Sequence, residues 1–265
     1  MPKSVLITGA SSGIGACAAR HLQERGFRVF GTRRKTRDDL PEGVHWIEMD
    51  VCDEASVGRG VAEVISAVTR LDALVCSAGL GIFGSVEEVS IEAAQQQLDA
   101  NYFGVLRTLR AVLPHMREVG GGRVVLVGSL AGRAPIPFQS HYSASKAALD
   151  ATALALRTEV RPFGIDVSLI EPGDINTPFN DAMHWTDVSG SAYGARVRSC
   201  EAVIRDSLPK APGPEVIARV IAKALTARRP RVRYAAGPDS ALVPLLRRLL
   251  PDWISLELIR SHFKV

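Results

Sequence analysis

The chain is poor in cysteine, and its few cysteines are widely scattered. Four occur among the 265 residues, at Cys17, Cys52, Cys76 and Cys200, and no two have the C-x-x-C spacing of a zinc site or a redox pair. Histidine, aspartate and glutamate form no ligand-like cluster either. We therefore expect reduced, mostly buried thiols, no disulfide scaffold and no metal site.

Long apolar runs are also missing. No run reaches the ~18 residues that a membrane-spanning helix needs. The N-terminus enters an apolar strand pattern at once, without a basic segment or a cleavage site. We expect no integral membrane segment and a cytoplasmic location.

Neither sign of charge dominates the sequence. The 32 Lys and Arg residues face 28 Asp and Glu residues, which leaves a formal net charge of +4. Most of these charges are interspersed and no nucleic-acid-binding motif accompanies them, so no nucleic acid partner is expected. Hydrophobic residues make up 46% and charged residues 23%, near the averages of globular domains, which predicts a large core.

Short β-branched apolar runs alternate with amphipathic helical stretches. Because parallel strands require long crossovers, this alternation predicts an α/β fold with a doubly wound, Rossmann-like parallel sheet and helices on both faces. One domain over residues 1–265 is expected, with a polar insertion at about 179–214 and a tail at about 235–265. The predicted strands are 4–7, 28–31, 44–48, 73–76, 123–127, 166–170 and 232–234.

A glycine-rich segment follows the first predicted strand. Residues 8–15 read T-G-A-S-S-G-I-G, and a helical pattern runs over 16–25. Glycines there permit a tight turn and a close approach of the backbone to a pyrophosphate, which would bind at the positive end of the helix. Such a pattern taken alone also fits a purely structural turn between a strand and a helix.

Together with Ser129, Tyr142 and Lys146, this loop resembles the short-chain dehydrogenase/reductase family. The resemblance covers most of the chain, from Val5 to about Thr177, and the three residues fall at the family's spacing. The local sequence at residues 29–34 and 162–165 resembles that of the NADP(H)-preferring branch of the family, which contains 17β-hydroxysteroid dehydrogenase type 1 and related bacterial reductases.

The resemblance implies a sheet order of 3-2-1-4-5-6-7, with the cofactor across the carboxyl ends of the strands. Residues 76–79 read Cys-Ser-Ala-Gly where the family usually has Asn-Asn-Ala-Gly. The sequence therefore does not show which side chains support the end of this strand in place of the two asparagines. The implied cofactor-binding residues are Gly9, Ser11, Ser12, Gly13, Ile14, Gly15, Thr32, Arg33, Arg34, Asp50, Val51, Ser77, Ala78, Gly79, Tyr142, Lys146, Pro172, Gly173 and Thr177.

The expected catalytic residues are Asn101, Ser129, Tyr142 and Lys146. Tyr142 and Lys146 lie at i and i+4, on one helix face. Lowering the pKa of a tyrosine from about 10 to about 7 needs roughly 4 kcal/mol. A cation at about 4 Å supplies that much only where water is partly excluded. We therefore expect a shielded pair in which Lys146 lowers the pKa of Tyr142.

By resemblance, Tyr142 is the general acid for ketone reduction, and Lys146 also binds the nicotinamide ribose. Ser129 donates to the substrate oxygen, and Asn101 helps to hold a water of a proton relay. Each residue also has an ordinary structural explanation when taken singly. His141 is interpreted as a solvent or loop residue, because adjacent helical residues do not share a face.

The substrate region and the tail leave alternatives open. Phe179, Met183, Trp185 and Tyr193 could form an apolar wall for a hydrophobic carbonyl or alcohol, such as a steroid-like compound, a keto ester or a fatty carbonyl, or they could simply pack on the core. The tail mixes apolar residues with basic ones, interrupted by two prolines. We favour packing on its own or a partner subunit over peripheral membrane contact.

Residues at the end of the second predicted strand indicate whether the protein prefers NAD(H) or NADP(H). Enzymes of this fold that use NAD usually carry an acid there, and this chain has Arg33 and Arg34 instead, which suits the 2′-phosphate of NADP(H). The predicted function is NADP(H)-dependent reduction of a ketone or aldehyde, with a non-catalytic NADP(H) sensor as the alternative. The helices predicted at 93–117 and 143–163 resemble those that the family pairs across a two-fold axis, so we expect a homodimer or homotetramer.

Overall fold

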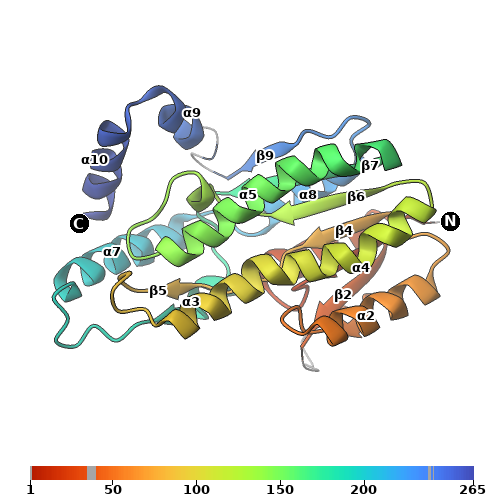
Figure 1. Cartoon of the computed structure of the whole chain (residues 1–265), viewed down its shortest axis with the longest axis horizontal. Helices are drawn as coiled ribbons and strands as arrows, with labels where there is room; N and C mark the ends of the chain where they lie inside the picture. The colour runs from red at the N-terminus through yellow and green to blue at the C-terminus, as the bar shows by residue number, and fades with distance from the viewer. Residues whose placement is uncertain (1, 35–39, 238–239, 241) are drawn as a thin grey trace.

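Seven parallel strands form the central sheet of the computed structural model, which describes residues 2–34, 40–237, 240 and 242–265 (Figure 1). Their order is β3-β2-β1-β4-β6-β7-β9, which confirms the order implied by the family resemblance. All six pairings are parallel. The strands are β1 (Ser4–Thr8), β2 (Arg28–Arg33), β3 (His45–Glu48), β4 (Ala73–Cys76), β6 (Gly122–Val127), β7 (Ile165–Pro172) and β9 (Arg233–Ala236).

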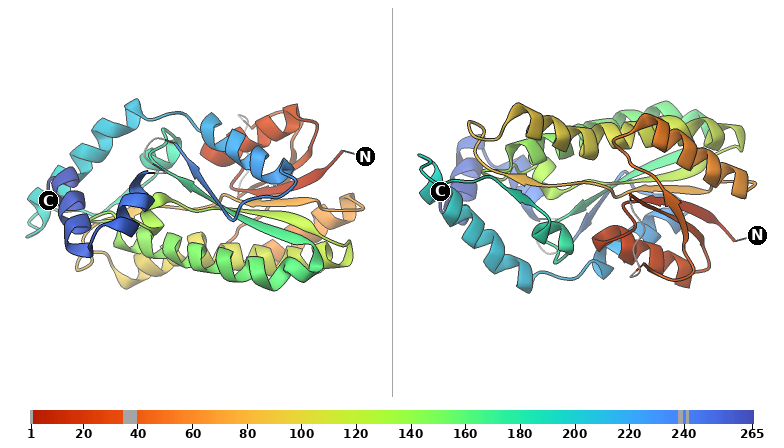
Figure 2. Two further views of the ribbon diagram at one scale, coloured as in Figure 1. Left: turned by 90° about the horizontal axis from the view of Figure 1, so that it is seen from above. Right: turned by 90° about the horizontal axis from the view of Figure 1, so that it is seen from below.

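Helices cover both faces of this sheet, as Figure 2 shows. On one face lie α1 (Gly13–Glu24) and α8 (Glu215–Thr226), and on the other α2 (Glu54–Ala67), α4 (Gly104–Glu118) and α5 (Ser140–Val160). Every residue of β1 and β4 is buried, as expected for parallel strands covered on both faces. Two apolar clusters, one on each face, form the core.

The helical stretch predicted at 93–117 is interrupted. It consists of α3 (Ile91–Leu98), a π-helical turn η1 (Asp99–Phe103) and α4. The π turn contains Asn101, whose buried side chain hydrogen-bonds across to another loop. Apolar periodicity continues through such a turn, which explains why the sequence pattern predicted one helix. The described residues also form the short 3₁₀ turns η2 (Leu130–Gly132), η3 (Arg161–Phe163) and η4 (Leu208–Lys210).

The segment predicted as an insertion at 179–214 contains α6 (Pro178–Asp181), β8 (His184–Trp185) and α7 (Gly194–Ser207). The two-residue strand β8 pairs with β5 (Ile82–Phe83), which follows β4, so a second small sheet fixes the segment near the end of the large one. Its role as a substrate insertion stays a prediction.

The tail forms α9 (Leu242–Leu249) and α10 (Asp252–Phe263), and residues 238, 239 and 241 of the predicted tail lie outside the described part. In Figure 1 both helices lie at the end of the molecule that also carries α7, and α10 contacts α7. Phe263 and Val265 pack against an apolar cluster that includes Met183 and Cys200, so the tail does pack on its own subunit. Within the described ranges, none of the helices has the length and apolar character needed to cross a bilayer.

Candidate active site

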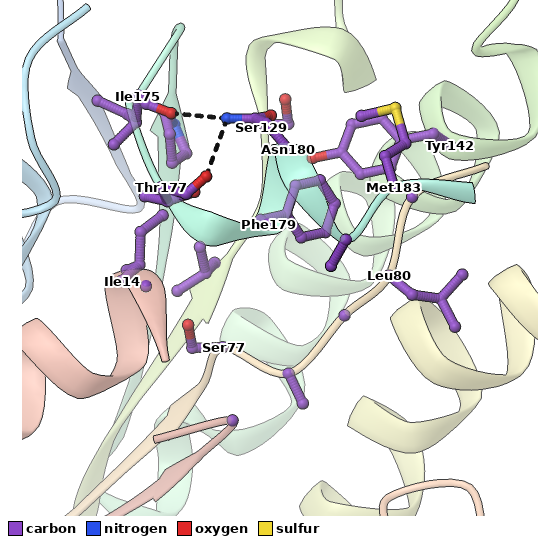
Figure 3. A pocket seen from close by; sticks show the side chains of 18 of the residues that line it. Ile14, Ser77, Leu80, Ser129, Tyr142, Ile175, Thr177, Phe179, Asn180 and Met183 are labelled. Atoms are coloured by element: carbon purple, nitrogen blue, oxygen red, sulfur yellow. Dashed lines mark hydrogen bonds between the residues drawn. The ribbon is translucent and has the colours of Figure 1, made fainter. Parts of the chain in front are cut away.

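The predicted site residues come together in one cavity of about 540 Å³ at the carboxyl ends of the strands (Figure 3). All nineteen residues expected to bind the cofactor line it, and so does Ser129. Asn101 does not line it. The parallel strands explain this meeting, because loops that are far apart in sequence leave the sheet at the same edge.

The phosphate loop lies directly against the loop that follows β4. Gly9 has a φ of +67°, and a Cβ there would lie 2.7 Å from the Ala78 Cα. A Cβ on Gly15 would lie 2.2 Å from the Gly9 carbonyl oxygen. The side chain of Ser12, which precedes α1, makes no cap hydrogen bond, and the first turn of α1 contains no acid. The loop therefore fits a pyrophosphate at the start of α1.

A threonine supplies the support left open by the missing asparagines. The Thr8 Oγ1 accepts hydrogen bonds from the backbone N–H groups of Ser77, at 3.1 Å, and of Ala78, at 3.3 Å. The Thr32 hydroxyl likewise accepts from the Gly9 N–H at 3.2 Å. Thr8 is part of the glycine-loop motif and could have been singled out from the sequence. The sequence does not show, however, that its partner is the loop after β4.

The end of β2 presents two arginines to the cavity. Arg33 is partly buried, and its Nε is buried without a hydrogen-bond partner among the described residues, whereas Arg34 is exposed. An unpaired buried donor of this kind is costly. An anionic group bound at this wall would satisfy it, so the residues present fit the 2′-phosphate of NADP(H).

Lys146 is buried in the second turn of α5. The residue is 7% exposed, and its Nζ donates to the carbonyl of Val127, the last residue of β6, at 2.9 Å. The Nζ lies 5.7 Å from the centroid of the Tyr142 ring. Burial lowers the pKa of Lys146 to about 8. The shielding expected for the Tyr142–Lys146 pair is therefore present.

The expected direction of the Tyr142 pKa shift was wrong for this form of the protein. Burial raises the pKa of Tyr142, and the nearby Ser129 hydroxyl opposes the rise. The reason is that the Lys146 ammonium is held by the Val127 carbonyl rather than by the phenol oxygen. The phenol therefore carries its proton at neutral pH, as a proton donor for carbonyl reduction must.

Ser129 reaches the site from the end of β6. It precedes η2, and its Oγ accepts from the Ala131 N–H at 3.1 Å. A Cβ on Gly132 would lie 2.9 Å from the carbonyl of Lys146, so η2 packs directly on the backbone of α5. This close approach fixes the serine beside the helix that carries Tyr142.

Asn101 binds two segments together. Its Oδ1 accepts from the Leu80 N–H at 2.8 Å, and its Nδ2 donates to the Leu80 carbonyl at 3.0 Å and to the Ser145 Oγ at 3.1 Å. The side chain thereby ties the loop after β4 to α5. Its part in a proton relay stays a prediction.

The loop that follows β7 covers the site. The Asn180 Nδ2 donates to the carbonyls of Ile175, at 3.1 Å, and Thr177, at 3.4 Å, as Figure 3 shows. This loop brings the Thr177 Cβ to within 3.6 Å of the position of a Cβ on Gly13, in the phosphate loop. It also places the Phe179 ring 6.0 Å from that of Tyr142.

The structure decides between the two alternatives left open for the four residues of the substrate region. Phe179 and Met183 line the cavity, but Trp185 and Tyr193 do not. The Trp185 ring packs against Phe83 with centroids 4.4 Å apart, because β8 pairs with β5. The Tyr193 hydroxyl donates to the Glu87 Oε2 at 2.7 Å. Both are therefore ordinary packing residues.

Several lining residues were missed by sequence reasoning. They include Leu80, Ile136, Gln139, Ile204, His262 and Phe263. Gln139 stands three residues before Tyr142, so it could have been placed on the same side of the helix start. His262 and Phe263 gave no signal, because only the course of the tail brings α10 to the cavity. The interpretation of His141 was wrong: it lies in the first turn of α5, half-buried, with its Nε2 buried and unpaired among the described residues.

A network of ion pairs surrounds the buried carboxylate of Glu171. Glu171, just before Pro172, is 3% exposed in its side chain and lies 3.6 Å from Arg133 and 3.8 Å from Arg233. Arg233 also donates to Asp150 of α5. Burial raises the pKa of Glu171, and the two arginines oppose the rise. The network links β7, β9, α5 and the end of the serine turn.

We predict that Lys146→Met changes the pH dependence of stability in the cofactor-free protein. The pKa of Lys146 falls on folding from 10.5 to about 8 because of burial. Between these values the unfolded chain holds a proton that the folded chain lacks, so stability rises with pH. As the pH is raised from about 8 to 10.5, the free energy of unfolding of the unchanged protein should therefore rise relative to that of the variant by about 1–3 kcal/mol.

The measurement is chemical denaturation of both proteins at several values between pH 7 and pH 10.5. Lys223→Met, which changes an exposed lysine of α8, is the control and should follow the unchanged protein. Parallel curves for the unchanged protein and Lys146→Met would contradict the burial of the ammonium.

Comparison with known proteins identifies the family. Residues 3–186 match the family model for short chain dehydrogenases. A 3-ketodihydrosphingosine reductase of Bacteroides thetaiotaomicron is 35% identical, over 100% of this chain and 97% of the relative. Human 17-beta-hydroxysteroid dehydrogenase type 1 is 35% identical, over 94% of this chain and 81% of the relative.

The fold agrees with these relatives. A short-chain dehydrogenase of known structure from Streptomyces avermitilis superposes with a TM-score of 0.84 at 32% identity, covering 100% of this chain and 96% of the other. The chain therefore belongs to the short-chain dehydrogenase/reductase family and is an oxidoreductase that acts on CH–OH or keto groups with NAD(P).

Proposed function

We propose that this protein is an NADP(H)-preferring reductase of hydrophobic ketones or aldehydes. The observation that carries the proposal is that one cavity is lined both by the two arginines and by Tyr142, Ser129 and the buried Lys146. The arginines fit the 2′-phosphate, and the protonated phenol fits a general acid.

The residues divide the chemistry between them. The nicotinamide, when bound, supplies the hydride to the carbonyl carbon. The Tyr142 Oη gives its proton to the carbonyl oxygen, and the Ser129 hydroxyl stabilises the negative charge that develops on that oxygen. Lys146 holds the ribose and favours the phenolate left behind. Asn101 keeps α5 and the loop after β4 in register.

The substrate class is proposed from the cavity lining. Phe179, Met183, Ile136 and Phe263 add apolar surface to the cavity that Tyr142 also lines, and Gln139 adds one buried polar side chain. Among the described residues its Nε2 donates to the Met183 sulfur, at 3.5 Å, which is a weak acceptor. The names of two relatives, one a keto-compound reductase and one a hydroxysteroid dehydrogenase, agree with a steroid-like compound, a keto ester or a fatty carbonyl.

Assembly as a homodimer or homotetramer is also proposed. Among the large apolar side chains that stay exposed are Phe103, next to α4, and Leu154 on α5, at 47% and 41%. Both lie on the helices that the family resemblance pairs across a two-fold axis. The alternative of a non-catalytic cofactor sensor is disfavoured, because Asn101, Ser129, Tyr142 and Lys146 are all present. The cytoplasmic location stays a prediction.

Tyr142→Phe should lower kcat by at least about a hundredfold while NADPH binding changes little, because it removes the transferable proton but little volume. The assay is NADPH oxidation with the best compound from a panel of steroids, keto esters, fatty aldehydes, quinones and sugars. Tyr193→Phe removes a hydroxyl outside the cavity and should keep full activity. Turnover of Tyr142→Phe within tenfold of the unchanged protein would refute the role of the phenol.

Catalytic efficiency with NADPH should exceed that with NADH by about a hundredfold, which corresponds to roughly 3 kcal/mol from charge-assisted hydrogen bonds. The double variant Arg33→Asp, Arg34→Ser should narrow or invert this ratio. Arg20→Ser with Arg59→Asp makes the same change of charge at exposed positions outside the cavity and should leave the ratio unchanged. Equal efficiency with both cofactors in the unchanged protein would show that Arg33 and Arg34 do not select NADPH.

A further inference from the structure

Exposed apolar side chains are concentrated in the last two helices. Within the described ranges, twelve large hydrophobic residues stay exposed, and seven of them belong to α9 and α10. We call α9 and α10 together the C-terminal arm. Its seven exposed residues are Leu242, Leu245, Leu246, Leu249, Trp253, Leu256 and Leu258.

In α9 the apolar stripe faces outward. Its four exposed leucines stand at i, i+3, i+4 and i+7, from Leu242 to Leu249, and therefore share one helix face. Pro244, on the opposite face, is the buried residue of α9. An amphipathic helix of a globular domain normally turns its apolar stripe toward the core. The orientation of α9 is the reverse.

In α10 one side is anchored and the other is free. Trp253 is 71% exposed, and Leu256, one turn further on, is also exposed. The other tryptophans, Trp46 and Trp185, are partly buried against apolar clusters. Phe263, near the end of α10, packs on the cluster beneath α7. The arm is therefore held on its own subunit and still leaves a large apolar surface uncovered.

Positive charge flanks this surface. The arm and the two residues after it contain Arg247, Arg248, Arg260 and Lys264 against two acids. Both acids are engaged locally: the Arg247 Nη1 lies 2.7 Å from Asp252, and the Arg260 Nη2 lies 2.5 Å from Glu257. In the described part of the chain, neither of these two acids is left over to neutralise Arg248. Lys264 lies close enough to Asp206 to help lower the pKa of that carboxyl, and Asp206 also pairs with Lys210.

The arm also forms part of the cavity wall. His262 and Phe263 of α10 line the cavity that holds Tyr142 and Phe179. Figure 1 shows α9 and α10 at the same end of the molecule as α7. Anything that binds the exposed side of the C-terminal arm would thus lie next to the apolar part of the cavity.

We propose that the C-terminal arm docks the protein on the surface of a membrane that contains anionic lipids. Short amphipathic helices with apolar residues on one side, a tryptophan and flanking cations bind in this way. A second copy of the chain is disfavoured as the occupant, because two arms would bring like charges together. Docking does not depend on the proposed substrate, but it would let a lipid-soluble carbonyl enter from the bilayer.

The test is co-sedimentation of the full chain with vesicles, without cofactor or substrate. We expect binding to vesicles of phosphatidylcholine mixed with phosphatidylserine and at least about tenfold weaker binding to phosphatidylcholine alone. The triple variant Leu245→Ser, Leu249→Ser, Trp253→Ser should lose at least about tenfold in partitioning. The triple variant Val86→Ser, Ile91→Ser, Phe163→Ser changes exposed apolar residues outside the arm and should bind as the unchanged protein does.

Two further measurements keep the proposal testable if the triple variant folds poorly. Arg248→Glu with Lys264→Glu should remove the preference for anionic vesicles. Tryptophan emission should shift to shorter wavelength on vesicle binding, and Trp253→Phe should abolish that shift. No sedimentation of the unchanged protein, or equal loss in the control variant, would overturn the proposal. So would a lower molecular mass of the arm variant by light scattering, because the arm would then contact a second copy.

Failure of docking is distinguishable from failure of the proposed function. Vesicle binding is measured without turnover, whereas NADPH oxidation with a ketone dispersed in detergent needs no vesicle. The arm variant should keep that detergent-dispersed activity, since its three substituted residues do not line the cavity.

Discussion

The parallel direction of all seven strands is the constraint on which the site depends. Each strand delivers the loop after it to the same edge, so residues from positions 9 to 177 meet in one cavity without any long-range motif in the sequence. Short polar side chains then lock neighbouring loops together. Thr8 holds the loop after β4, and Asn101 joins that loop to α5.

Burial of charged and polar groups shifts the pKa values in the site, and it also lowers the stability of the protein without a ligand. The Lys146 ammonium has one carbonyl partner in a buried position, and the Arg33 Nε has none among the described residues. Groups of this kind oppose folding in the absence of a ligand. They gain partners when an anionic, hydrogen-bonding cofactor is bound, so the same features that weaken the free protein favour the complex. The raised pKa of Tyr142 also results from burial and keeps its proton available.

Features that local sequence patterns determine were predicted well. Alternating strands and helices predicted the parallel sheet. The family resemblance carried by the glycine loop and by the spacing of Ser129, Tyr142 and Lys146 implied the sheet order and the nineteen expected residues that line the cavity. Features that depend on contacts between distant segments were missed. The π turn at Asn101, the pairing of β8 with β5 that removes Trp185 from the wall, and the return of α10 to the cavity each require the folded chain. The direction of the Tyr142 pKa shift depends on which oxygen holds Lys146, and spacing alone does not show that.

The central claim is that a hydride is transferred, within this cavity, from a nicotinamide to a carbonyl carbon beside Tyr142. NADPH deuterated at the transferable position of C4 tests it most directly, with a hydrophobic ketone as substrate and mass spectrometry of the product. The account predicts an alcohol that carries one deuterium on its carbinol carbon, formed in step with oxidation of the cofactor. Consumption of the ketone without deuterium in the product, or oxidation of the cofactor without formation of the alcohol, would contradict it.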